Sequence, residues 1–480
     1  MPPHEISSKS TSSAERKTSI WEVQEVSKVM KKEVHRIKMW NWLANRFDTD
    51  AAERCENNPS KMIPFDTLNA PKKVQEELSE RFVLSTTKVI KRQESVRGDT
   101  TKLLIECHDG HQIETVVMRH SNYSTVCVSS QVGCKMGCKF CATGTMGIIR
   151  NLTAGEILEQ VAHANSVSRI RNVVFMGMGE PLNNYESIKD TISVLVDQRL
   201  FSMSPKHLTV STVGVLKEMR RLEDEFPLVN FALSLHAPNQ SVRLKIVPTA
   251  SANAYEDLLA ALDYRINHER ERRARKEAMS GKTGHRHTDE DRISSYTATI
   301  MIEYILLHGV NDMPELAHEL GQVLKPRKNF ILLNLIPYNP TDVGDAYEPP
   351  SDIDIRKFHE ILVSEEYRIH TRVRKEMGQD IDGACGQLVV EHQKRGKGKG
   401  KGKEREDALE IEDISLVAKK PTSGTSSNSS NSSNSSIRDK KRRGKRAGLS
   451  DQKKTYIVAG CAVVAALSCL FVFSRVRRRS

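Results

Sequence analysis

Residues 134–141 read CKMGCKFC, three cysteines at the spacing C-x3-C-x2-C with no fourth cysteine close behind them. Nine cysteines in 480 residues are too few for a disulfide scaffold, so thiols clustered in this way indicate metal chemistry. A structural zinc site needs four ligands, and only His163 or Cys127 is a candidate for the fourth. An iron–sulfur cluster also binds cysteine thiolates, and three of them leave one iron open to another molecule. The predicted metal ligands are Cys134, Cys138 and Cys141.

The basic charge of the chain is concentrated at its C-terminal end. The formal charge is +12, but residues 393–480 carry 22 Lys and Arg against 8 Asp and Glu, so the preceding residues are close to neutral. Charge alone therefore does not indicate what the core binds. Residues 1–19 are rich in Ser and Lys and have no apolar run, which is not typical of a secretory signal and predicts a disordered start. A reducing compartment fits this pattern.

The C-terminal region divides into a polar part and an apolar part. Residues 393–454 are low in complexity and have little to bury, which predicts a disordered basic linker. Residues 455–473 contain no charged side chain and would span roughly 28 Å as a helix, close to the thickness of a bilayer core. We expect a transmembrane anchor rather than a buried helix. The catalytic part would face the cytoplasm, including the case of an organelle's outer surface.

The middle of the chain, residues 96–392, alternates apolar runs with helical periods. Such alternation predicts an α/β fold with a parallel sheet covered by helices, in the form of a full or partial (β/α) barrel. Residues 20–95 are periodic at steps of three and four and predict a small helical accessory domain. The charged residues 268–295 interrupt the pattern and are interpreted as a surface insertion. The predicted strands are residues 125–130, 173–179, 207–214, 230–237, 299–307, 330–338 and 369–375.

Several motifs across residues 96–392 resemble one known family. The stretches CVSSQVGCKMGCKFCATGTMGIIRNLT (127–153), GMGEPLNNY (177–185), SLHAP (234–238), EYILLHGVND (303–312), NLIPYNP (334–340) and DIDGACGQL (380–388) occur in order. Together they resemble the RlmN/Cfr family of radical-SAM RNA methyltransferases. The resemblance implies a radical-SAM partial barrel with a 4Fe–4S cluster and S-adenosylmethionine (SAM), which binds at the open iron.

The resemblance also implies roles for individual residues. Cys385 would carry the methyl group, Cys127 would release the product by forming a disulfide with Cys385, and Glu114 would be a base. Gly179 and Glu180 would contact the amino group of SAM. The other implied SAM contacts are Ser211, Ser234, Leu235, His236 and Asn339.

The family chemistry accounts for a two-thiol relay. Carbon 2 of adenine is electron-poor and does not attack the methyl group of SAM, whereas a thiolate does. Two SAM molecules per turnover are implied, one to methylate Cys385 and one to activate that methyl group through a radical. The Cys127–Cys385 disulfide must then be reduced. A flavodoxin- or ferredoxin-type protein is expected as the electron donor, and the enzyme is expected to be a monomer.

The expected activity is methylation of adenosine carbon 2 in large-subunit ribosomal RNA, and also in transfer RNA. One alternative is methylation at carbon 8, as in the other branch of the family. A second is a membrane-tethered RNA-binding protein whose cluster is structural. Phosphate contacts are expected near the mouth of the barrel. The candidates are Lys135, Lys139, Arg150, Arg372, Arg374 and Lys375.

Overall fold

A computed structural model describes most of the chain between residues 17 and 388. The described ranges are 17–47, 52, 54–65, 69–280, 300–341, 347–375 and 377–388. They all belong to one compact unit. The predicted linker and the predicted anchor at 455–473 lie outside the described residues. None of the helices described is both long enough and apolar enough to cross a membrane.

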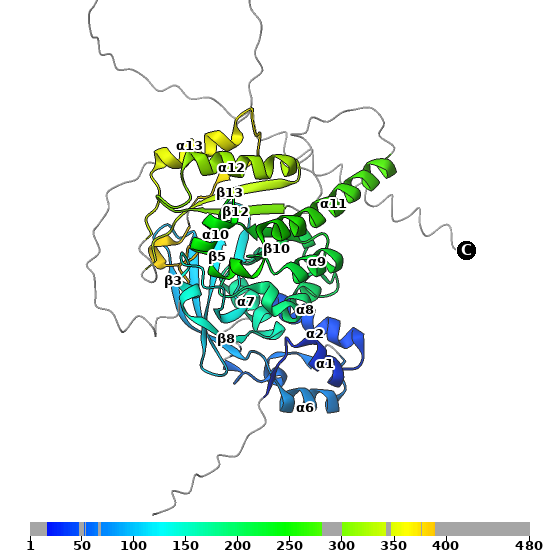
Figure 1. Ribbon diagram of the computed structural model, residues 1–480. Helices are drawn as coiled ribbons and strands as arrows, with labels where there is room; N and C mark the ends of the chain where they lie inside the picture. Colours follow the sequence, from blue (N-terminus) through cyan, green and yellow to red (C-terminus); the bar gives the residue numbers. More distant parts are fainter. Residues whose placement is uncertain are drawn as a thin grey trace, which may run out of the picture. The chain divides into compact units, whose positions relative to one another are not determined.

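A ten-stranded sheet forms the centre of the protein (Figure 1). Seven of its strands are parallel and follow one another in chain order. They are β6 (Ser124–Cys127), β9 (Ile170–Phe175), β10 (Leu208–Thr212), β11 (Asn230–Ser234), β12 (Ile300–Leu306), β13 (Ile331–Pro337) and β14 (Thr371–Val373). Each overlaps one of the seven predicted strands, so the predicted α/β core is confirmed.

Three antiparallel strands extend the sheet beyond β6. They are β5 (Gln112–Arg119), β4 (Thr100–Cys107) and β3 (Thr87–Glu94). The sequence did not predict these strands. The two edge strands of the sheet are β14 and β3, so the barrel is partial rather than closed.

Helices follow the parallel strands and cover the outer face of the sheet. They are α7 (Ala154–Val167), α8 (Tyr185–Val196), α9 (Leu216–Glu225), α10 (Gln240–Ile246), α11 (Tyr255–Ser280), α12 (Pro314–Leu324) and α13 (Asp352–Val363). Paired residues of neighbouring strands share one face. The outer row that includes Leu233 and Ile302 is fully buried. On the inner row, Ser211 and Ser234 are only half-buried, which leaves a lumen lined by polar side chains.

The N-terminal region packs against α7 and α8 at one end of the protein (Figure 1). It contains β1 (Thr18–Ser19), α1 (Val23–Val29), α2 (Glu33–Arg46), α4 (Pro59–Met62), α6 (Lys72–Arg81) and β2 (Phe82–Val83). The buried carboxylate of Glu159 in α7 accepts hydrogen bonds from the hydroxyls of Ser19, Ser85 and Thr87. These bonds tie the region to the core.

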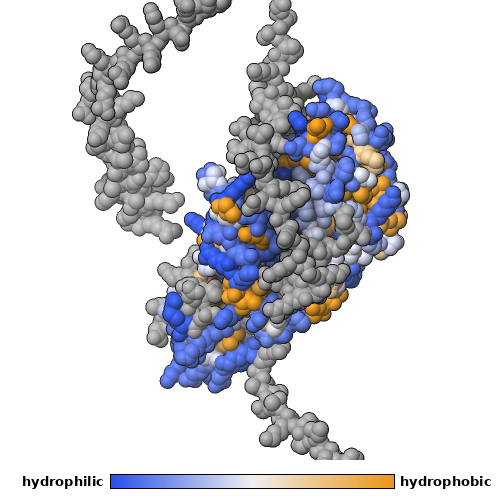
Figure 2. Space-filling model, turned by 90° about the vertical axis from the view of Figure 1, so that its left-hand side faces the viewer, coloured by the Kyte–Doolittle hydropathy of each residue, from blue (hydrophilic) through white to orange (hydrophobic). Residues whose placement is uncertain are grey.

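Two expected boundaries differ from those in the structure. The boundary at 95/96 falls between β3 and β4, which pair with each other as a hairpin, so the sheet begins at Thr87. The expected insertion begins inside α11, which continues to Ser280 and in which Glu269 forms ion pairs with Arg272 and Arg273. Residues 281–295 are not among those described. The face in Figure 2 is mainly hydrophilic, with hydrophobic side chains in small separate groups.

Candidate active site

The predicted site residues gather at the carboxyl ends of the parallel strands, as expected for a (β/α) barrel. Cys127 is the last residue of β6, and Gly179 and Glu180 lie just beyond β9. Ser211 lies near the end of β10, and Ser234 ends β11. Leu235 and His236 follow it directly, and Asn339 follows β13. One end of the lumen therefore collects residues from five strands.

The three cysteines occupy a compact loop after β7 (Gln131–Cys134), which pairs with β8 (Gly147–Asn151). The Cys141 amide donates to the Cys138 carbonyl at 3.1 Å, and the Lys139 amide donates to the Ile246 carbonyl at 3.0 Å. Burial raises the pKa of the Cys134 thiol to about 12 and also raises the pKa values of Cys138 and Cys141. A bound cationic centre would offset this cost, because metal ligands are thiolates.

The spacing of these thiols fits a cluster better than a single metal ion. Zinc with sulfur ligands at about 2.3 Å would bring the sulfur atoms within roughly 4 Å of one another. Among the described residues, the one set of three possible ligand atoms within 4.8 Å of one another is on His308, Asp312 and Asp354, not on the cysteines. His163, the alternative fourth ligand, instead lies 2.9 Å from Thr87 Oγ1, and burial lowers its pKa to about 4.

Two buried acceptors in the lumen, on Asn339 and Glu303, suit SAM, which carries amino and hydroxyl donors. Neither Asn339 Oδ1 nor Glu303 Oε2 has a hydrogen-bond donor among the residues that the structure describes. Buried polar atoms are usually paired, so a ligand that donates to them is expected. Ser211 Oγ and Ser234 Oγ lie 3.3 Å apart in the same lumen.

Glu180, the predicted contact of the SAM amino group, lies just beyond β9. Its carboxylate accepts from the backbone amides of Leu182 at 3.0 Å and Val213 at 2.9 Å, so it links the ends of β9 and β10. Burial raises its pKa to about 6. Gly179 has a φ of 101°, and a Cβ there would lie 2.6 Å from Gln131 Cβ, so this close turn requires glycine.

Leu235 and His236 are fixed by their neighbours. The Leu235 amide donates to the Glu303 carbonyl at 3.1 Å, and His236 Nδ1 accepts from the Ile305 amide at 3.1 Å. Burial lowers the pKa of His236 to about 3, so the ring is neutral. Its edge faces the ring of Phe140 in the cysteine loop, with 4.9 Å between ring centroids. The loop and the end of β11 therefore pack together.

The structure brings Cys385 next to both Cys127 and the cysteine loop. Its segment is held by the Ala142 amide, which donates to the Gly386 carbonyl at 2.7 Å, and by Thr143 Oγ1, which donates to the Leu388 carbonyl at 2.6 Å. Asn339 Nδ2 donates to the Cys385 carbonyl at 3.2 Å. Both thiols are free.

Burial raises the pKa of Cys127 to about 12, and the neighbouring Cys385 adds to this shift. Charge interactions with Cys385, Glu303 and Cys127 raise the pKa of the nearby Arg374.

Glu114 lies on the antiparallel part of the sheet. Val116 pairs with Cys127, so Glu114, two residues away on β5, lies on the same inner face as that thiol. Its carboxylate is buried and forms an ion pair with Lys102 of β4, with 3.0 Å between Nζ and Oε1. The predicted base and the predicted thiol pair are therefore on one side of the lumen.

Sequence reasoning missed several polar residues of this lumen. Lys102, Glu303 and Asn334 each interrupt an apolar strand, and that interruption was the available signal. Arg243 of α10 is buried and donates to the carbonyls of Leu235, Ser234 and Val213, which hold the ends of β10 and β11. Nothing in its local sequence distinguishes it from a surface arginine.

Two of the candidate phosphate contacts are engaged elsewhere. Arg150 is held by Asp109 and Glu156, and Arg372 Nε donates to Asn334 Oδ1 at 2.6 Å. Lys135 and Lys139 are exposed on the cysteine loop.

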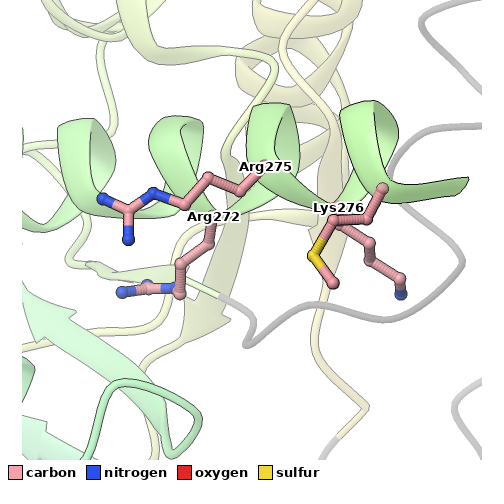
Figure 3. Close-up of a pocket in the computed structure, with 4 residues that line it drawn as sticks. Arg272, Arg275 and Lys276 are labelled. Carbon is pink, nitrogen blue, oxygen red and sulfur yellow. The ribbon is translucent and has the colours of Figure 1, made fainter.

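A separate surface pocket lies on α11 and includes none of the predicted site residues. It is lined by Arg272, Arg275, Lys276 and Met279 (Figure 3). Arg272 is paired with Glu223 and Glu269, and Arg275 with Glu271.

Comparisons with known proteins match the part of the chain that forms the strand-end lumen and the cysteine loop. The family model described as the radical SAM superfamily matches residues 128–268, which contain the loop and the strands β9, β10 and β11. Fold and site therefore define a radical SAM enzyme.

Relatives that match over most of their length identify a narrower family within the radical SAM enzymes. The chain is 40% identical over 337 residues to "Ribosomal RNA large subunit methyltransferase N" of Nitrosopumilus maritimus, covering 67% of this chain and 86% of that protein. It is 38% identical over 325 residues to "Probable dual-specificity RNA methyltransferase RlmN" of Clostridium novyi, covering 67% and 85%. A radical SAM methyltransferase from Sphaerobacter thermophilus matches with a TM-score of 0.61 and 32% identity, over 77% of this chain and 97% of that one.

The chain belongs to the RlmN family of radical SAM RNA methyltransferases. It is a SAM-dependent methyltransferase that uses a 4Fe–4S cluster and SAM. The expectations for the family, the enzyme class and the cofactors are confirmed.

Proposed function

We propose that this enzyme methylates carbon 2 of adenosine in large-subunit ribosomal RNA, and that transfer RNA is a second substrate. One observation carries the proposal: Cys385 and Cys127 lie together beside the cysteine loop, with Glu114 on the same face of the sheet. A binding protein with a structural cluster has no need of such a thiol pair. The "dual-specificity" name of the Clostridium novyi relative supports a second RNA substrate.

In the proposed reaction, the Cys385 thiolate takes a methyl group from one SAM and forms a methyl thioether, with release of S-adenosylhomocysteine. Cys134, Cys138 and Cys141 would hold the cluster. The cluster and a second SAM, when bound, supply the radical chemistry that activates this methyl group. Glu114 takes the proton from the base carbon after that carbon has joined the carrier carbon, and the unpaired electron of the adduct would return to the cluster.

Cys127 releases the product. Its thiolate attacks the Cys385 sulfur, so an S–S bond forms and the bond from Cys385 sulfur to the carrier carbon breaks. The electron pair leaves with the carrier carbon, which takes up a proton. Two electrons from an external dithiol then restore both thiols. Burial raises the pKa of Cys127 to about 12, so the thiol must lose its proton before it attacks.

The Cys127→Ala variant tests this relay. It should form the bond between Cys385 and RNA but fail to break it, so a covalent protein–RNA species should accumulate on a denaturing gel. Cys55→Ala is the matched control, because the Cys55 thiol contacts only the Lys61 carbonyl at 3.6 Å among the bonds identified. Multiple turnover by Cys127→Ala would contradict the relay.

Product analysis tests the position of the methyl group. Nucleosides from ribosomal and transfer RNA treated with the enzyme should contain 2-methyladenosine. The appearance of 8-methyladenosine instead would favour the alternative regiochemistry. RNA binding without any methylation, by protein with a full complement of iron, would favour the non-catalytic alternative.

Exposed lysines on the cysteine loop support a contact with RNA phosphates. Lys135 and Lys139 flank the buried Cys138 at the mouth of the lumen. Glu in place of both should weaken RNA binding and make the dependence of affinity on salt less steep by about two contacts. If the dependence of affinity on salt concentration did not change, RNA phosphates would contact other residues.

The sequence supports a membrane anchor at residues 455–473, where 19 consecutive residues lack charge. We propose that it tethers the enzyme with its catalytic part facing the cytoplasm. Full-length protein should stay with the membrane pellet after alkaline carbonate extraction, whereas protein lacking 455–480 should become soluble. Extraction of both forms would contradict the anchor.

A further inference from the structure

The ion pair between Lys102 and Glu114 is buried inside the lumen. The two side chains are 6% and 3% exposed, and Lys102 Nζ lies 3.0 Å from Glu114 Oε1. A buried ion pair contributes little to stability relative to well-packed apolar side chains, because both charges lose their hydration. Stability therefore does not explain why β4 carries a lysine at this position among Thr101, Leu103 and Leu104.

The same ammonium group reaches the segment that carries Cys385. Lys102 Nζ also donates to the Asp382 carbonyl at 3.3 Å, three residues before the thiol. Lys102 thus contacts both the predicted base and the predicted carrier segment.

Further contacts hold this segment against the β3–β4 hairpin. The Val96 amide donates to Asp380 Oδ2 at 2.7 Å. Gly378 has a φ of 72°, and a Cβ there would lie 2.6 Å from Thr100 Cγ2, so the backbone lies directly on the strand. The contact from Lys102 is therefore one of several that hold residues 377–388 against the hairpin.

Cys385 itself is held by a different set of contacts. Its carbonyl accepts from Asn339, and the residues after it bond to Ala142 and Thr143 of the cysteine loop. Removal of Lys102 leaves these contacts in place. Its effect should therefore fall on Glu114 and not on the thiol.

We propose that Lys102 is a positioning residue that holds the Glu114 carboxylate in register with the carrier segment during methyl transfer to RNA. The ammonium group fixes one carboxylate oxygen and ties its position to the Asp382 carbonyl. This inference rests on the proposed function, because the roles of Glu114 and Cys385 belong to it. It adds a residue that acts in the second half of the reaction and not in the first.

The two half-reactions separate this role from a general structural one. In Lys102→Met, methylation of Cys385 by SAM, followed by peptide mass spectrometry, should stay within about threefold of wild type. RNA methylation in single turnover should fall roughly 30- to 100-fold, as for other residues that orient a reacting group. Lys102→Arg should recover most of the rate, because guanidinium reaches the same two acceptors.

A second substitution of Lys102 and a control substitution complete the test. Lys102→Gln keeps a donor for the Asp382 carbonyl but loses the charge, and it should behave like Lys102→Met even if the latter folds poorly. Lys88→Met is the matched control, because Lys88 lies on the exposed side of the neighbouring strand β3. Its RNA methylation should equal that of wild type.

The possible results separate failure of the role proposed for Lys102 from failure of the proposed function. RNA methylation within twofold of wild type in Lys102→Gln overturns the positioning role, and so does an equal loss of both half-reactions and of iron. Wild-type protein that loads Cys385 but never methylates RNA overturns the proposed function instead.

Discussion

The parallel and antiparallel parts of the sheet contribute different chemistry to one lumen. The parallel strands from β6 to β14 bring together the residues predicted to bind SAM, beside the loop that holds the three cysteines. The antiparallel strands from β5 to β3 supply Glu114 and Lys102 and the surface on which the Cys385 segment docks. In the proposed reaction, the parallel part holds the SAM contacts and Cys127, and the antiparallel part positions the base Glu114.

Loss of the cluster should have the largest effect, because both parts of the lumen then lack radical chemistry. Cys138 is buried in the cysteine loop. Cys138→Ala should lower bound iron well below about four per chain, bleach the brown absorbance of anaerobically reconstituted protein, and reduce RNA methylation to background. Cys55→Ala should retain all three properties. A colourless Cys138→Ala enzyme that still methylates RNA would remove the cluster from the mechanism.

A substitution in the carrier segment should affect transfer and spare the cluster. Gln387 is buried, its Nε2 donates to the Pro340 carbonyl at 3.0 Å, and its Oε1 accepts from the Ala384 amide at 3.1 Å. Gln387→Leu loses two hydrogen bonds of about 1 kcal/mol each, so RNA methylation should fall roughly 30-fold. Iron content should not change.

Gln379→Leu, at an exposed position in the same segment, is the control for Gln387→Leu. Equal rates for the two variants would show that the turn around Cys385 does not need this support.

A substitution on the parallel side should weaken SAM binding. Arg243→Leu leaves the carbonyls of Leu235, Ser234 and Val213 without their donor, which should raise the Kd for SAM about tenfold and destabilise the fold by about 2–4 kcal/mol. Calorimetry with SAM and thermal unfolding measure the two effects. Lys245→Leu, exposed on the same helix, should change neither. Unaltered SAM affinity in Arg243→Leu would mean that these strand ends do not position the cofactor.

The pH dependence of SAM binding should show the smallest effect. Burial raises the pKa of Glu180 to about 6, so its carboxylate is ionised above that pH and becomes protonated as the pH falls through 6. If Glu180 binds the positive amino group, affinity for SAM should be constant above pH 7 and decrease by about tenfold towards pH 5. In Glu180→Gln the affinity should be weaker and independent of pH over this range. A pH-dependent Glu180→Gln variant would assign the titration to another group.

The parallel strands could be predicted from sequence because both of their faces are covered or enclosed. Their runs are almost continuously apolar and end in polar motifs such as MGMGEP. In β3, by contrast, TKVIKRQE mixes charges with few apolar residues, because one side of this edge strand faces solvent. The hairpin pairing of β3, β4 and β5 depends on register between strands, which a single sequence does not show.

Candidate site residues were predictable where a motif marks them, and not where only distant contacts do. The cysteine spacing and the GACGQL motif identified four thiols directly. Lys102 was missed because its partner, the Asp382 carbonyl, is 280 residues away in the sequence. Arg243 was missed because its partners are carbonyls at the ends of two strands. The helices α9 and α10 have weak local signals for a different reason, since α9 is highly charged and α10 has only seven residues.

Residues 377–388 join the β3–β4 hairpin to the loop after β13 through side-chain hydrogen bonds, and no described strand of this segment pairs with the sheet. Such a seam can part without breaking any rung between strands. A base that leaves its helix must reach the buried thiols, and in the proposed reaction this segment carries the thiol that delivers the methyl group. A displacement of this segment to admit the base would therefore also displace Cys385.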